Sequence, residues 1–96
     1  MNAEFRAFVE AKIAVVRVLM TQREGESVGD AIERTDGLYG RQEAYRATLA
    51  FMDDLGGNLD NLRAAIMAAL PHARGSEHQD LQTAQQLLAE FDASTA

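Results

Sequence analysis

Hydrophobic residues recur at intervals of three and four along most of the chain, and this spacing predicts helices. The first predicted helix covers residues 3–24. Its apolar residues form one broad face: Phe5, Phe8, Val9, Ile13, Val16, Leu19 and Met20. Because Val15 and Val18 widen this face beyond what one neighbour covers, we expect the helix to be central or shared with another subunit. Its β-branched residues leave a strand over 13–20 as the alternative, but the helical spacing on both sides favours a helix.

The same spacing predicts four more helices, over residues 28–36, 39–55, 59–71 and 77–92. Ser27 and Asn58 precede two of them as candidate N-caps, because their side chains can accept a hydrogen bond from the first turn. Gly37 stands where a left-handed C-terminal cap belongs, and the pair Gly56–Gly57 is a strong stop signal.

No alternating run of β-branched residues predicts a strand pair, and the links between the helices are short. Short links favour antiparallel neighbours. The predicted fold is therefore all-α, a small bundle or orthogonal array of four to five helices. Residues 1–92 form a single domain in this prediction, and residues 93–96 form a frayed tail.

Composition narrows the class of protein. With 96 residues the chain suits one small domain, and a hydrophobic fraction of 47% is too high for a disordered one. The absence of Cys excludes a disulfide framework, a thiol nucleophile and a thiolate metal site. The longest apolar stretch, over residues 13–20, contains Arg17 and is too short to span a membrane. Since no signal segment is recognisable, we expect a cytoplasmic protein without a membrane partner.

The net charge of −6 is unevenly distributed, with +2 over residues 1–23 and −4 over each of 24–37 and 75–96. This balance opposes direct binding to nucleic acid, which requires Lys and Arg against the phosphates. One reading is charge complementarity between packed helices or subunits. The other is an acidic surface for a basic partner, with a candidate patch of Glu24, Glu26, Asp30, Glu33 and Asp36. A second acidic group comprises Glu77, Asp80, Glu90 and Asp92.

Residues with possible catalytic or metal-binding chemistry form no coherent set. His72 and His78 lack the spacing of metal-binding motifs, and the pair Asp53–Asp54 lies at a predicted helix end, where negative charge is disfavoured. Ser27 and Ser76 are explained as helix caps. We therefore predict no metal, no cofactor and no enzymatic activity. A helix-turn-helix over residues 28–55 is an alternative that the surrounding carboxylates disfavour.

The prediction that remains is binding to another protein. The first helix carries more apolar surface than a monomer of this size easily hides, so we expect a homo-oligomer. The candidate interface residues are Phe5, Phe8, Val9, Val16, Met20 and Tyr39. The alternative is a small acidic inhibitor, of the kind that phages and mobile elements encode, which blocks a basic surface of a nucleic-acid-binding complex.

Overall fold

A computed structural model describes residues 2–21 and 23–95. The described residues form four α-helices and no strand: α1 (Asn2–Met20), α2 (Val28–Asp54), α3 (Leu59–Ala69) and α4 (Gly75–Thr95). A single 3-10 turn, η1 (Leu70–His72), follows α3 and contains Pro71, the residue expected to end that helix. The predicted all-α class is confirmed, and the segment 13–20 is helix rather than strand.

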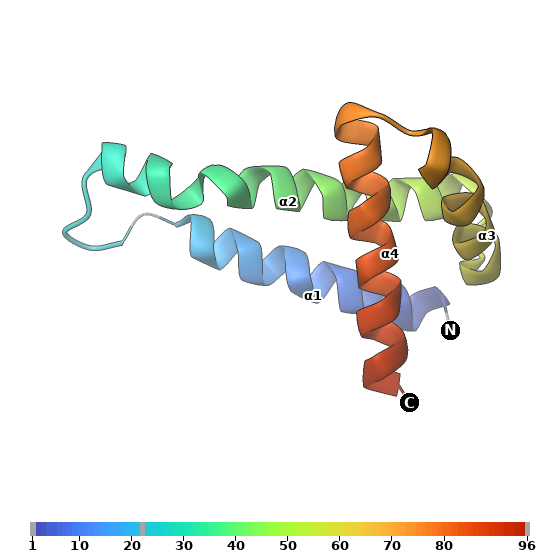
Figure 1. The fold of residues 1–96 in the computed structure, drawn as a ribbon. Coiled ribbons are helices and arrows are strands. Elements are labelled where there is room, and N and C mark those ends of the chain that lie inside the picture. Colours follow the sequence, from blue (N-terminus) through green and yellow to red (C-terminus); the bar gives the residue numbers. More distant parts are fainter. Residues whose placement is uncertain (1, 22, 96) are drawn as a thin grey trace.

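The helices are arranged as a long hairpin crossed at one end (Figure 1). α1 and α2 run antiparallel side by side, α4 crosses both of them, and α3 stands at the C-terminal end of α2. The molecule is accordingly elongated, with extents of 46 × 29 × 22 Å. The tip of the hairpin, which includes the α1–α2 loop, projects away from α3 and α4.

The hydrophobic core lies where the four helices meet, at the end opposite the hairpin tip. Its buried members come from every α-helix: Phe5, Val9, Ile13, Leu49, Met52, Leu59, Leu62, Ile66, Leu81, Ala84, Leu87, Leu88 and Phe91. The ring of Phe91 on α4 meets Phe5 and Phe8 of α1 edge to face, with centroids 5.3 and 5.6 Å apart. Such contacts add to the burial of apolar area, so Phe91 fastens the last helix to the first.

The expected break at Gly37 is absent, and the two predicted helices 28–36 and 39–55 are one helix, α2. The side of α2 that lies along α1 continues across Gly37 without interruption. Its buried and half-buried residues keep helical spacing: Arg34, Leu38, Gln42, Tyr45, Leu49 and Met52. This packing outweighs the low helix propensity of the exposed glycines within α2. The helix-turn-helix alternative is therefore not formed.

Two helices begin after the predicted caps Ser27 and Asn58, but Ser76 is not a cap, because α4 begins at Gly75 and Ser76 lies within its first turn. Two other helix ends also differ from the prediction. Ser27 and Asn58 accept hydrogen bonds from the backbone N–H groups of Asp30 and Asn61, both at 3.1 Å. However, α1 ends at Met20 rather than residue 24, because side chains take up its last carbonyl groups, as described below. α4 continues through residues 93–95, which were expected to fray, and the hydroxyls of its last two residues donate to the carbonyl of Phe91. Ala96 lies outside the described residues.

Within the residues that the structure describes, none of the helices is long and apolar enough to cross a membrane.

Candidate functional site

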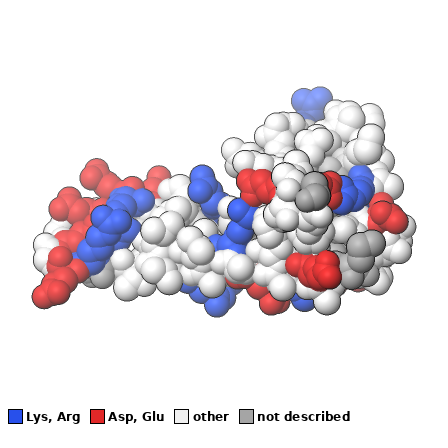
Figure 2. All heavy atoms as spheres, turned by 90° about the horizontal axis from the view of Figure 1, so that it is seen from below, with Lys and Arg blue, Asp and Glu red and all other residues white. Residues whose placement is uncertain are grey.

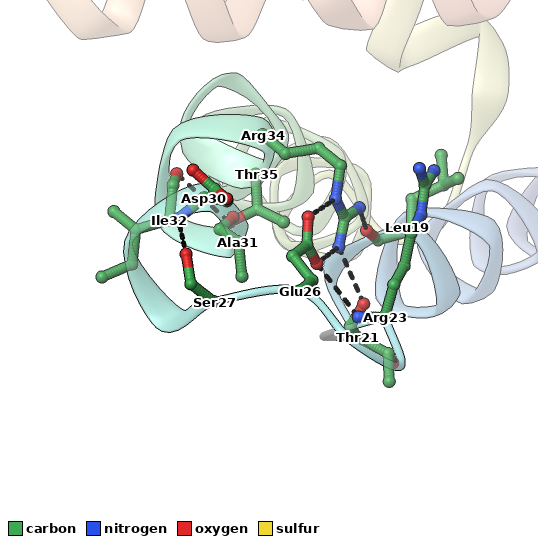
Figure 3. A network of polar contacts seen from close by, with 10 residues as sticks. All are labelled: Leu19, Thr21, Arg23, Glu26, Ser27, Asp30, Ala31, Ile32, Arg34 and Thr35. Atoms are coloured by element: carbon green, nitrogen blue, oxygen red, sulfur yellow. Dashed lines mark hydrogen bonds and ion pairs between the residues drawn. The ribbon is translucent and has the colours of Figure 1, made fainter.

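Large apolar side chains are exposed mainly on the hairpin. On α1 they are Val15, Val18 and Leu19, with exposed fractions of 58%, 73% and 41%. On α2 they are Val28, Ile32 and Tyr39. Ile32 points away from α1, so its side chain does not join the exposed residues of that helix (Figure 3). An exposed apolar face on a small domain is a candidate interaction surface.

The exposed side of α1 is apolar along most of its length. Successive residues of a helix turn by about 100° about its axis, which places five exposed apolar residues on the side opposite Val9 and Ile13, together with the exposed Glu4 near the start of α1. We call this set the outward face of α1: Ala7, Ala11, Ala14, Val15 and Val18. Figure 2 looks onto the side of α1 turned away from α2, and uncharged atoms predominate along its middle. Helix α1 therefore has two opposite apolar sides, of which α2 and α4 cover only one.

The predicted interface residues fall mostly on the covered side. Phe5, Val9 and Val16 are buried within the chain itself, so they are not available at the surface. Phe8 and Met20 are half-buried, whereas Tyr39 is 60% exposed on α2. The side of α1 that carries Phe5 and Ile13 buries more apolar area in total than the outward face, which includes three alanines, and it therefore faces the core. The outward face is left exposed.

The hairpin tip is closed by Arg34, which reaches back from α2 to the end of α1 (Figure 3). Its guanidinium group donates hydrogen bonds to the carbonyl oxygens of Leu19 and Thr21 and to both carboxylate oxygens of Glu26 at 2.8 and 2.9 Å. The backbone N–H of Arg23 also donates to Glu26, at 3.0 Å. The hydrogen bonds from Arg34 and Arg23 lower the pKa of Glu26 from 4.5 to about 2.

Arg34 also explains the early end of α1. The hydroxyl of Thr21 donates to the carbonyl of Arg17, and the carbonyl of Leu19 accepts from Arg34, so these groups need no further helical turn. No sequence pattern indicated this contact, since Arg34 and Leu19 lie in different predicted helices. The capping residue for α1 is in effect supplied by α2.

The predicted acidic patch lies at this tip and in the N-terminal part of α2. Four of its five carboxylates are exposed, and Glu26 is the half-buried partner of Arg34. Arg23 and Arg34 lie among them, and Figure 2 shows acidic and basic side chains together at this end of the molecule. The tip therefore carries mixed charge. That it binds a basic partner stays a prediction.

Two of the C-terminal carboxylates join helices instead of forming a separate patch. Glu90 of α4 contacts Lys12 of α1 at 2.6 Å. Asp92 receives two hydrogen bonds from Arg63 of α3, at 2.6 and 2.7 Å, and this pairing lowers the pKa of Asp92. These contacts account for part of the uneven charge by complementarity between packed helices.

The remaining candidates for chemistry lie apart. Asp53 pairs with Arg6 of α1, which offsets the cost of a carboxylate at the end of α2, and Asp54 is exposed. His72 is exposed after α3, and His78 is half-buried in the first turn of α4. In the described part of the chain, no group of three or more His, Asp or Glu side chains is placed to hold a metal ion.

A polar hollow lies where α1, α2 and α4 meet, with a volume of about 230 Å³. Its lining includes Lys12, Arg41, Tyr45, Thr83 and Glu90. Two of its charged groups, Lys12 and Glu90, are already engaged with each other. Among residues 2–21 and 23–95, neither Ser nor His lines it.

Comparison with known proteins found no match among family models, curated proteins or solved structures.

Proposed function

We propose that this chain is a non-enzymatic protein-binding domain that self-associates through the outward face of α1. One observation carries the proposal: α1 is apolar on two opposite sides, and its own chain covers only one of them. Leaving Val15 and Val18 more than half exposed costs free energy that a second apolar surface would recover. The proposal keeps the predicted homo-oligomer and moves its interface from the buried residues to the exposed ones.

A second copy of the chain is the partner that best fits this face. Its residues Ala7, Ala11, Ala14 and Val18 follow one another at intervals of four, three and four, the spacing by which a helix packs along another helix. The alanines allow two helix axes to approach closely. A second outward face offers the same pattern, so the surface is complementary to itself, as a two-fold interface requires.

The test is the mass of the protein in solution, measured by light scattering during size-exclusion chromatography over a range of concentrations. We expect the wild-type chain to have twice the mass of one chain. Val18→Glu places an unpaired charge in the proposed interface and is expected to give single chains of unchanged helical content. Ile32→Glu is the matched control, since Ile32 is similarly exposed but lies on α2.

Two results would overturn the proposal. A wild-type chain that stays single at every concentration at which it remains dissolved would exclude self-association. A dimer that survives Val18→Glu but is lost with Ile32→Glu would place the interface on α2.

A further inference from the structure

The edges of the outward face determine how two copies can meet. We infer that the two α1 helices pack antiparallel, with Glu10 of each copy against Arg17 of the other. This inference rests on the proposed self-association and adds its direction and register. Its first support is the heptad spacing of the seam, which assigns Ala7, Ala11, Ala14 and Val18 to the positions that interdigitate.

Glu10 and Arg17 occupy the same edge of the seam. They are seven residues apart, so they hold the same position in successive heptads, directly before Ala11 and Val18. Both side chains are exposed, and within the described residues neither takes part in an ion pair. In contrast, Arg6, Lys12 and Arg63 are each paired with a carboxylate on another helix. Among the charged residues of α1, Glu4, Glu10 and Arg17 take part in no ion pair within the described residues, and of these three Glu10 and Arg17 share this edge.

An antiparallel pair brings these charges together twice. When Ala11 packs beside Ala14 of the second copy, Ala7 packs beside Val18, and equivalent edge positions of the two helices face each other. Glu10 then faces Arg17 of the second copy, and the two-fold axis repeats the pair. In a parallel pair the same register would place Glu10 opposite Val15, where a carboxylate finds no partner.

The other edge of the seam is apolar and supports the same arrangement. It carries Phe8 and Val15, which are also seven residues apart. In the antiparallel register Phe8 of one copy lies beside Val15 of the other. Phe8 is half-buried against Phe91, so α4 crosses α1 on this edge and leaves the Glu10–Arg17 edge clear. Helix α2 runs along the side of α1 opposite the seam (Figure 1).

Charge reversal tests the pairing directly. In Glu10→Arg chains both pairs become repulsive, and the same holds for Arg17→Glu chains, so each is expected to dimerise roughly tenfold more weakly than wild type. The double variant Glu10→Arg/Arg17→Glu restores both pairs and is expected to regain wild-type affinity. Glu33→Arg, on α2, makes the same change of charge outside the seam and is the matched control.

Mixing the two single variants gives the sharpest readout. A Glu10→Arg chain carries two positive charges on this edge and an Arg17→Glu chain carries two negative ones, so the two chains complement each other at both pairs in the antiparallel arrangement. We therefore expect the mixture to form heterodimers with an affinity at least that of wild type. The dissociation constants are measured by sedimentation equilibrium at low salt, where ion pairs at an exposed edge are least screened.

The outcomes separate this inference from the proposed function. A wild-type chain that does not dimerise overturns both. A wild-type dimer whose affinity is unchanged by either single reversal, or a mixture that shows no preference for heterodimers, overturns the antiparallel register and leaves self-association standing. Since the chain has no Cys, cross-linking gives a second measurement. A mixture of Ala7→Cys and Val18→Cys chains is expected to form mixed disulfides in preference to those within either variant, and the reverse preference would contradict the register.

Discussion

Because α2 continues through its glycines, replacing them by alanine is expected to raise the stability of the protein. Gly37 and Gly40 lie in the interior of this helix, and a Cβ atom added to either would meet no atom within 4 Å beyond its chain neighbours and the adjoining backbone of the helix. Replacing glycine by alanine at such a position removes backbone freedom from the unfolded chain without creating a clash. We therefore expect Gly37→Ala and Gly40→Ala to stabilise the protein.

The expected magnitude follows from helix propensity. Alanine is about 0.8–1.0 kcal/mol more favourable than glycine in an exposed helix interior, so the two substitutions together contribute about 2 kcal/mol. For a domain of this size, each 1 kcal/mol raises the melting temperature by roughly 4–8 °C. Because dimerisation also shifts the melting temperature, all variants are compared at one protein concentration.

Urea unfolding followed by circular dichroism measures the effect. If the slope of the unfolding free energy against urea concentration is unchanged, the variant exposes the same surface area on unfolding as the wild type. Gly56→Ala is the control of opposite sign, since Gly56 has a φ of +79° that alanine adopts only at a cost of about 1–2 kcal/mol. A loss of stability in Gly37→Ala comparable to that of Gly56→Ala would refute the continuous helix. It would show that Gly37 is left-handed and separates two helices.

Two further predictions concern the core and the hairpin tip. Phe91→Ala is expected to lower the free energy of unfolding by about 3–5 kcal/mol in urea titrations. Met67→Ala, at an exposed apolar residue of α3, is the control and is expected to change this free energy by under about 0.5 kcal/mol. Equal effects of the two substitutions would contradict the central place of Phe91 in the core. Because the pKa of Glu26 is lowered from 4.5 to about 2, its contribution to stability is present above about pH 4.5 and is lost as the pH falls toward 2. Glu26→Gln should therefore lose less stability than wild type over that interval, and parallel losses would show that the contact with Arg34 contributes nothing.

The sequence predicted local features of the fold better than contacts between distant residues. Ser27 and Asn58 were recognised as caps because an N-cap depends on residues within one turn. Gly37 was misread because a glycine signals a stop only where no neighbouring helix holds the chain in place, and α1 does so here. The contact of Arg34 with Leu19 has no local signal, since a long side chain reaches it across the hairpin.

For the candidate surface, too, the sequence predicted the local pattern but not the packing against other helices. The apolar width of α1 indicated correctly that one neighbour does not cover this helix. Periodicity showed the broad face that contains Phe5 and Val9, but it did not show that this face is buried within the chain itself rather than at a subunit interface. The packing of Phe5 and Val9 decided this, and it left the smaller Ala11 and Ala14 outside.

The contact of Phe5 with Phe91 joins the first helix to the last and has a consequence for the order of folding. The α1–α2 hairpin is built from neighbours in the sequence, so its loop closes at low entropic cost and we expect it to form early. The aromatic contact closes almost the entire chain into one loop and is expected to form late. A nascent chain that has not yet released α4 therefore carries both apolar sides of α1 near Phe5 and Phe8 uncovered. Synthesis of the last helix is the step that removes one of those sides from competition with other chains.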